Sequence, residues 1–241
     1  MCATISSHSL HAAGVFVLPR HCPICETTID DPIRHWCLAC ESRLKVFESP
    51  VCPVCRRFRS DDDCECPAGH EPSLPSTVIA LGCFDDGWGR LVHAIKYDGY
   101  RHLTAPLGAL LAQRVDPDAF DLVVAVPTSA KKRRNRGFGH AEELAQAAAA
   151  ELNLPILAEA LTFTRPVKDQ TRLSALQRRA NLDEAMVVAE TAAIAQKRVL
   201  LIDDVMTTGA TISEAARALV AAGAQRVSGA VIAVNLDAQL P

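Results

Sequence analysis

A stretch of thirteen residues decides the fold: Val199-Leu200-Leu201-Ile202-Asp203-Asp204-Val205-Met206-Thr207-Thr208-Gly209-Ala210-Thr211. Its first four residues are apolar, which is typical of a strand buried on both faces. Two adjacent carboxylates follow where that strand should reach the surface, and a turn of hydroxyl side chains and one glycine leads into a predicted helix over 212–222. In open α/β sheets ligands bind at the carboxyl ends of strands, and a helix N-terminus there attracts anions. The stretch therefore predicts a phosphate in the turn, with the two carboxylates facing polyol hydroxyls or a metal ion.

An ordinary capping role is the alternative, because Asp and Thr often cap helices that bind nothing. Capping explains Thr211 or one aspartate, but it leaves two consecutive carboxylates and three threonines around one glycine unexplained. The pattern resembles the motif with which type I phosphoribosyltransferases bind 5-phosphoribosyl 1-pyrophosphate (PRPP). By that resemblance Asp203 and Asp204 are catalytic residues that hold the ribose hydroxyls, directly or through Mg²⁺. The 5′-phosphate would be cradled by Thr207, Thr208, Gly209, Ala210 and Thr211.

The length of 241 residues allows one domain with an appendage or two modest domains. The net charge of −3 gives no global case for nucleic-acid binding, so any such surface must be local. No apolar run approaches the length of a membrane span. The apolar run 12–18 is short and has no lysine or arginine before it, which makes it a poor signal peptide. We expect a cytoplasmic protein.

Eight of the ten cysteines lie between Cys22 and Cys66. They form three C-x-x-C pairs and one C-x-C pair, and two such pairs complete a tetrahedral zinc site. Pairing in sequence order gives a double zinc ribbon, in a segment that would not fold without its metal. Redox-active pairs, an Fe–S cluster or, in a secreted protein, disulfides are the alternatives, and His21, His35 or His70 could replace a cysteine ligand. The predicted ligands are Cys22, Cys25, Cys37 and Cys40 for the first site, and Cys52, Cys55, Cys64 and Cys66 for the second.

The chain divides into a loosely attached or disordered tail over 1–20, a zinc module over 21–70 and an α/β domain over 76–241, with a proline-containing linker between the last two. Strands and helices alternate in the last part, so we expect a parallel sheet with helices on both faces. The predicted strands cover 77–84, 121–127, 156–163, 186–189, 199–202 and 227–234, and the predicted helices cover 88–97, 103–115, 139–152 and 212–222.

Two basic stretches, 131–138 and 165–181, interrupt this alternation. A run of charge is usually a solvated face, and that interpretation suffices for either stretch alone. Both are expected to follow strands of the sheet that carries the phosphate turn. Together they suit a pyrophosphate group on a sugar phosphate.

The chain resembles the ComF family, also described as GntX-like, which pairs an N-terminal double zinc ribbon with a type I phosphoribosyltransferase domain. Beyond the PRPP motif, the resemblance is carried by Lys96 in the run Ala94-Ile-Lys-Tyr-Asp-Gly99, by Val126-Pro127, by Arg136-Gly137-Phe138, and by the spacing of Gln170, Leu173, Arg178 and Asn181. Two departures stand near the expected pyrophosphate loop. Gly139-His140 replaces the usual Asn-Gln, and Thr128-Ser129 replaces a frequent Leu-His.

The resemblance implies a Mg²⁺-dependent transfer of the phosphoribosyl group, with the acceptor unknown. In such enzymes the bond from ribose C1 to pyrophosphate breaks early, so neutralising the leaving group matters more than a strong base. Thr128, Ser129 and Lys131 would contact pyrophosphate, while a loop carrying the catalytic candidates Arg165, Lys168, Gln170 and Arg178 closes over the site.

The family is also linked to competence and the uptake of transforming DNA, which makes single-stranded DNA and a competence helicase possible partners. A protein that senses PRPP without turnover, or one that binds single-stranded DNA, is the alternative to an enzyme. The sequence shows no pattern that would identify the acceptor.

Overall fold

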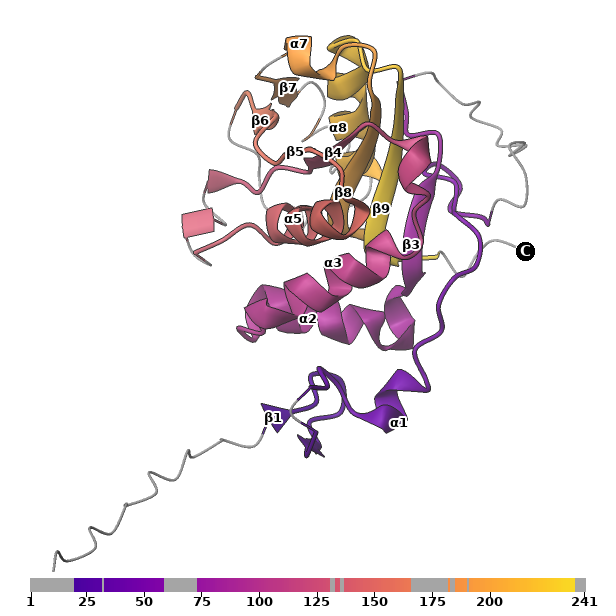
Figure 1. Cartoon of the computed structure of the whole chain (residues 1–241), viewed down its shortest axis with the longest axis vertical. Coiled ribbons are helices and arrows are strands. Elements are labelled where there is room, and N and C mark those ends of the chain that lie inside the picture. Colours follow the sequence, from indigo (N-terminus) through magenta and orange to yellow (C-terminus); the bar gives the residue numbers. More distant parts are fainter. Residues whose placement is uncertain are drawn as a thin grey trace, which may run out of the picture.

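The computed structural model describes residues 20–31, 33–58, 73–130, 133–134, 137–165, 182, 185–189 and 191–236. Its centre is a five-stranded parallel sheet (Figure 1), which confirms the predicted α/β class. From one edge to the other the strands are β3 (Val78–Cys83), β9 (Arg226–Val234), β8 (Arg198–Met206), β4 (Leu122–Ala125) and β5 (Ile156–Leu157).

Helices cover both faces of this sheet, and alternate residues of β8 point to opposite faces. Leu200 and Ile202 pack with α2 (Gly89–Tyr97), α3 (Thr104–Ala112) and α5 (His140–Leu152), whereas Val199 and Leu201 pack with α8 (Ala210–Ala221). All four of these β8 side chains are fully buried. The short helices are α1 (Leu38–Glu41), η1 (Phe84–Trp88), η2 (Arg101–Leu103), η3 (Pro117–Ala119) and α7 (Thr191–Ile194).

The connections that leave β4 and β8 run toward opposite edges of the sheet. From β4 the chain passes through α5 to β5 on one side, and from β8 it passes through α8 to β9 on the other side. Ligands of open α/β sheets bind in the crevice where neighbouring strands send their connections in opposite directions. In this chain the neighbouring strands with opposite connections are β4 and β8.

The expectation of a single strand over 156–163 was wrong. Two residues form β5 at the edge of the main sheet, and β6 (Leu161–Phe163) pairs antiparallel with β7 (Met186–Val188) in a separate ladder. The turn between them is Ala158-Glu159-Ala160, whose residues have little preference for strands. The basic stretch that begins at Arg165 consequently follows the small ladder and not the main sheet, which corrects the second half of the expected arrangement.

An ion pair anchors the amino end of β8. The Arg198 guanidinium donates to both carboxylate oxygens of Asp121, at 2.7 and 3.1 Å, and the Arg198 backbone N–H donates to the same carboxylate at 2.8 Å. These hydrogen bonds hold the pKa of Asp121 well below its usual range. The contribution to stability is thus present at neutral pH and is lost as the pH falls from the ordinary carboxyl pKa through the lowered one.

Residues between the second and third cysteine pairs line the β3 edge of the sheet. The Val51 N–H donates to the Val78 carbonyl at 2.8 Å and Val78 donates back at 2.9 Å, while the Phe47 N–H donates to Leu81 at 2.9 Å. The Trp88 indole N–H reaches the Lys45 carbonyl at 2.9 Å. The division at 70–76 stays a prediction, but residues on either side of it are in direct contact.

Replacing Trp88 with Phe should lower the free energy of unfolding by about 1–3 kcal/mol, because it removes a buried hydrogen bond and leaves the Lys45 carbonyl unpaired. Trp88 is 2% exposed, and a Cβ at Gly82 would lie 2.2 Å from its indole nitrogen, so other side chains have little room to fill the gap. Equilibrium unfolding in urea measures the change. An unchanged midpoint and slope would contradict this role for Trp88.

Candidate functional site

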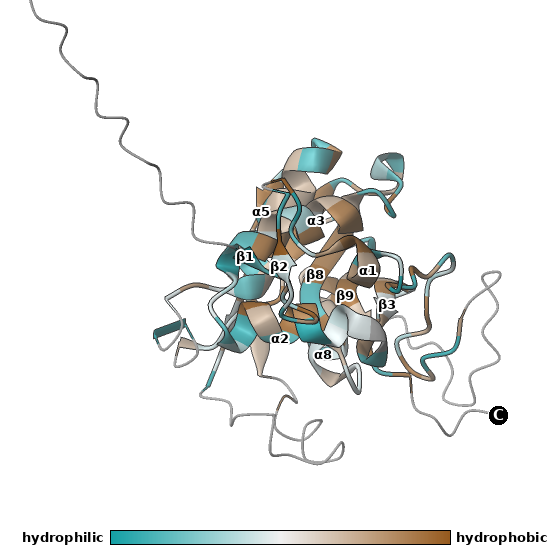
Figure 2. Cartoon of the chain, turned by 90° about the horizontal axis from the view of Figure 1, so that it is seen from below, coloured by the Kyte–Doolittle hydropathy of each residue, from teal (hydrophilic) through white to brown (hydrophobic). Residues whose placement is uncertain are grey.

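The two adjacent carboxylates lie within β8, close to its carboxyl end. β8 is longer than the apolar run predicted, because its pairing with β9 continues from Asp203 opposite Val231 to Met206 opposite Val234. Figure 2 shows this hydrophilic part of β8 among strands that are otherwise hydrophobic. The Asp204 N–H donates to the Asp203 carboxylate at 2.8 Å. Since consecutive strand residues point to opposite faces, the Asp203 side chain lies on the α8 side and the Asp204 side chain on the side of α2 and α5.

Lys96, near the end of α2, supplies the positive charge beside these carboxylates. Its Nζ lies 2.7 Å from Asp204 Oδ1, and the side chains of both residues are mostly buried, at 18% and 14% exposed. The Lys96 ammonium thus sets one positive charge against the negative charges of the two neighbouring carboxylates. The sequence marked Lys96 only as part of a family motif, and its side chain turns out to contact the predicted site directly.

His140 approaches the same carboxylate from the first turn of α5. Its Nδ1 lies 3.7 Å from Asp204 Oδ2, and the residue is 2% exposed. The His140 ring also packs edge to face against Phe138, with 4.9 Å between the ring centroids. The departure from the family pattern at position 140 therefore brings an imidazole to Asp204.

The turn after β8 leads directly into the N-terminus of a helix. Thr207, Thr208 and Gly209 connect the strand directly to α8, which begins at Ala210, two residues earlier than predicted. Gly209 has a φ of 75°, which only glycine adopts without strain. The N-terminus of this twelve-residue helix thus opens at the carboxyl end of β8, where its dipole and backbone N–H groups favour an anion.

The third cysteine pair lies against this turn. Arg56 Nη1 donates to the Thr207 carbonyl at 2.7 Å, and a Cβ on Gly209 would lie 2.6 Å from the Pro53 carbonyl oxygen. Both contacts join segments about 150 residues apart, and no spacing in the sequence could have indicated them.

On the other side of the crevice lies the segment that follows β4. The Thr128 N–H and hydroxyl both donate to the carboxylate of Glu142, at 3.1 and 2.8 Å, and Arg133 Nη2 lies 2.6 Å from Glu142 Oε1. Glu142 is 6% exposed in the first turn of α5, so it ties this segment to the helix. Ser129 lies next in the chain and its carbonyl accepts the Arg133 N–H at 2.9 Å.

Of the residues expected in the closing loop, the structure describes Arg165, which is exposed just after β6. Lys168, Gln170 and Arg178 lie outside the described residues, as does Lys131 of the pyrophosphate segment. The β6–β7 ladder holds the two ends of this loop together, because Phe163 pairs with Met186.

The first cysteine cluster is assembled as the sequence predicted. The sulfur atoms of Cys22, Cys25, Cys37 and Cys40 all lie within 4.8 Å of one another. Four sulfurs at about 2.3 Å from a tetrahedral zinc ion lie roughly 3.8 Å apart, and Cys25 and Cys37 are 3.6 Å apart. Hydrogen bonds from Thr27, the first from its hydroxyl at 3.0 Å, lower the pKa of Cys25 to about 6 and favour the thiolate that a metal needs. The cluster can therefore hold a zinc ion.

The Cys52 pair repeats the backbone pattern of the Cys22 pair. The Glu26 N–H donates to the Cys22 carbonyl at 2.8 Å, and the Arg56 N–H donates to the Cys52 carbonyl at 3.0 Å. Both donor residues have a positive φ, 64° for Glu26 and 58° for Arg56. The third pair thus has the same backbone turn as the first pair. Its expected partners Cys64 and Cys66 lie outside the described residues, so the second site stays a prediction.

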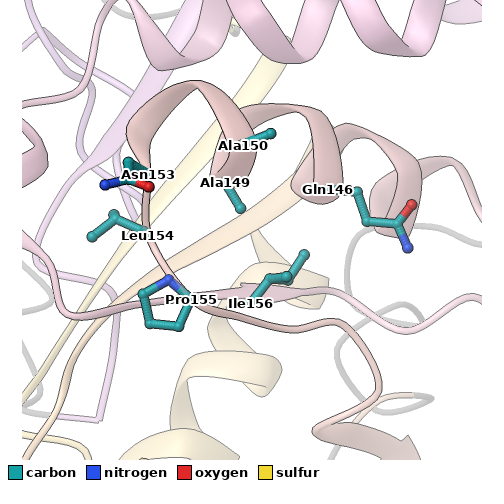
Figure 3. A pocket seen from close by; sticks show the side chains of 7 residues that line it. All are labelled: Gln146, Ala149, Ala150, Asn153, Leu154, Pro155 and Ile156. Carbon is teal, nitrogen blue, oxygen red and sulfur yellow. The ribbon is translucent and has the colours of Figure 1, made fainter.

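A separate surface groove of about 480 Å³ lies where α5 ends and β5 begins (Figure 3). This is the amino end of β5, away from the carboxyl ends that carry Asp204. The groove has no ionisable lining residue and so no charge for a phosphate. Its lining consists of Gln146, Ala149, Ala150, Asn153, Leu154, Pro155 and Ile156.

The chain is similar to several known proteins. Residues 134–241 match the model of the phosphoribosyl transferase domain. DNA utilization protein YhgH of Salmonella typhi is 28% identical over 214 residues, which span 79% of this chain and 93% of that protein. Competence protein F of Haemophilus influenzae is 27% identical over 205 residues, or 79% and 86% of the two chains. The solved structure of the allosteric regulatory enzyme of purine biosynthesis is 24% identical with a TM-score of 0.38, over 53% of this chain and 25% of its own.

The match over residues 134–241 and the parallel sheet thus indicate a phosphoribosyl transferase domain. The competence and DNA utilization relatives, together with the four-cysteine cluster before that domain, confirm the resemblance to the ComF family. Among the described residues, no helix has the length and apolar character needed to cross a membrane.

Replacing Cys40 with Ser should lower the bound zinc by about one ion per chain, because three remaining thiolates leave the tetrahedral site incomplete. Zinc content measured by mass spectrometry after dialysis checks this. Cys83→Ser is the matched control, since Cys83 lies in β3 outside the cluster. Equal zinc in the wild type and the Cys40 variant would show that this cluster is not a metal site.

Proposed function

We propose that this protein binds PRPP with Mg²⁺ at the crevice above β4 and β8 and transfers its phosphoribosyl group to an acceptor. The observation that carries the proposal is the turn after β8. It combines a left-handed Gly209, the N-terminus of a twelve-residue helix and the carboxylates of Asp203 and Asp204 at one strand end. A phosphate and a polyol are the two chemical groups that such a pair of features recognises.

Each part of PRPP has a counterpart in this arrangement. The 5′-phosphate would take the N–H groups and hydroxyls of residues 207–211, and the ribose hydroxyls would face Asp203 and Asp204. Asp203 and Asp204 are the residues beside which Mg²⁺ would bind with PRPP, and the ion would neutralise charge on the leaving group. The pyrophosphate would lie toward Ser129 and Lys131. The N–H and the hydroxyl of Thr128 both donate to the Glu142 carboxylate, so Thr128 would act mainly by fixing the shape of the segment that follows β4.

Lys96 and His140 would set the orientation of the Asp204 carboxylate relative to the ribose hydroxyls. Lys96 holds one carboxylate oxygen, and the imidazole stands beside the other. A carboxylate held by the Lys96 ammonium accepts a hydrogen bond from a ribose hydroxyl in a defined direction, without first losing conformational freedom. The loop between β6 and β7 would close over the bound donor and exclude water.

The first test is ligand-dependent thermal stability. PRPP with Mg²⁺ should raise the melting temperature of the wild type, because a ligand bound only to the folded state stabilises it. The double variant Asp203→Ala, Asp204→Ala should lose most of that shift. A suitable control is Asp116→Ala with Asp118→Ala, which removes the same charge beside Arg198 at the amino end of β8. No shift with the wild type, or an equal shift with the double variant, would refute PRPP binding here.

The second test concerns the imidazole beside Asp204. His140→Gln should keep PRPP affinity within about threefold, because an amide side chain also places a polar group beside Asp204. His140→Ala should weaken it by roughly tenfold, the equivalent of about 1.4 kcal/mol. Isothermal titration calorimetry with PRPP and Mg²⁺ measures both values. If the alanine variant binds as tightly as the wild type, His140 has no part in the site.

A protein that binds PRPP without turnover is the first alternative, and Gly139-His140 in place of the family's usual Asn-Gln is what favours it. Pyrophosphate release, measured with candidate bases and amines as acceptors, separates a sensor from a transferase. DNA handling is the second alternative, favoured by relatives that carry the names competence protein and DNA utilization protein. Single-strand binding that weakens steeply with salt would support it.

A further inference from the structure

The third cysteine pair belongs by sequence to the zinc module, yet it touches the turn that we assign to the 5′-phosphate. The segment concerned is 52–56, called here the second knuckle because it opens the second predicted zinc site. Its Arg56 side chain donates to the Thr207 carbonyl at 2.7 Å, and its Pro53 carbonyl lies within contact distance of Gly209. Cys52 and Pro53 are buried, and Arg56 is half-buried. These contacts therefore lie in the protein interior and not at its surface.

We propose that the second knuckle is a structural part of the phosphate site, and that Arg56 is a positioning residue for the turn 207–209. The inference rests on the proposed PRPP site and adds a residue outside the phosphoribosyl transferase motif to it.

The geometry of the peptide bond explains how Arg56 would act. A trans peptide is planar, so its C=O and N–H point in opposite directions. Arg56 holds the Thr207 carbonyl toward the second knuckle, and the N–H of Thr208 must then point away from the knuckle. An N–H fixed in that direction is available to an anion on the inner side of the turn. Without the guanidinium the peptide between Thr207 and Thr208 is free to rotate. Ligand binding must then order it, and the lost conformational entropy lowers the affinity.

Pro53 restricts the same turn from outside. Gly209 has a φ of 75°, and the Pro53 carbonyl fills the space where any larger residue would place its Cβ. The glycine is therefore required twice, once by its backbone conformation and once by the close approach of the second knuckle. The turn cannot relax toward the knuckle, so its open side is the ligand side.

The backbone of the second knuckle in turn sets the position of Arg56. Arg56 has a φ of 58°, a left-handed conformation that an L-residue adopts at a cost, and its N–H donates to the Cys52 carbonyl at 3.0 Å. Cys52 and Cys55 flank this turn, and thiolates at that spacing suit one zinc ion. Residues that hold a metal would thereby also hold Arg56, and the order of the phosphate turn would depend on the state of these two cysteines.

The test uses the full-length, metal-loaded chain and compares Arg56→Ala with Arg57→Ala. Arg57 is the matched control, because it is the neighbouring arginine and its side chain is exposed. Hydrogen exchange of the backbone amides at 207–211 is measured without ligand, and PRPP affinity is measured by calorimetry. Arg56→Ala should speed exchange in that segment roughly tenfold and weaken PRPP binding roughly five- to twentyfold, as expected for a lost hydrogen bond to a charged group. Arg57→Ala should leave both values unchanged.

The two readouts separate the inference from the proposed function. Unchanged exchange in Arg56→Ala overturns the inference, and so does equal PRPP affinity of Arg56→Ala and the wild type. Faster exchange in Arg56→Ala together with no PRPP binding by the wild type refutes the proposed ligand and still supports the positioning role of Arg56. Arg56→Lys keeps one donor on a flexible stem and should restore part of the protection.

The dependence on the second knuckle is tested with Cys55→Ser beside Cys40→Ser, which breaks the first cluster. Cys55→Ser should speed exchange at 207–211 as Arg56→Ala does, and Cys40→Ser should have the smaller effect there. An equal effect of the two cysteine variants overturns the specific link between the second knuckle and the turn. If Cys55→Ser does not fold, the arginine pair still decides the positioning role.

Discussion

The ion pair between Lys96 and Asp204 is the constraint that organises the carboxyl edge of the sheet. Two carboxylates at the end of a strand buried on both faces need a compensating charge, and a helix must bring it there. The pair therefore fixes where α2 ends relative to β8. His140 adds the start of α5 to the same point. One charged contact thus relates three elements that are distant in sequence, and the crevice between β4 and β8 keeps its shape around it.

The sequence predicted the parts of this structure that depend on local pattern. The β8 strand, its carboxylates and the glycine turn follow from neighbouring residues, and the first cysteine cluster follows from two short spacings. The break between β5 and β6 was missed because an apolar run hides a turn when the turn residues are alanine and glutamate. The contacts of Arg56, Pro53 and Glu142 could not be predicted, since each joins side chains whose distance in the chain has no characteristic value. Lys96 was named as part of a motif, and only the fold shows what its ammonium group touches.

Position 140 departs from the family pattern and still places a ring nitrogen beside Asp204. In the sequence, Gly139-His140 weakens the case for a competent pyrophosphate segment. In the structure the imidazole is buried against Phe138 and stands beside Asp204, where a glutamine amide would also have a donor to offer. The other departure, at Thr128, is accommodated because the Glu142 carboxylate accepts hydrogen bonds from both the N–H and the hydroxyl of Thr128. Both substitutions alter how the crevice is supported and leave its main charges in place.

The pairing of residues 47–51 with β3 has a consequence for solubility. A parallel sheet of this kind has two open edges, and an exposed edge is a template on which another chain can add a strand. At one edge β5 is only two residues long. At the other, the six residues of β3 would be exposed without the hydrogen bonds from Phe47 and Val51. The segment that joins the cysteine pairs therefore also covers an edge on which another chain could otherwise add a strand.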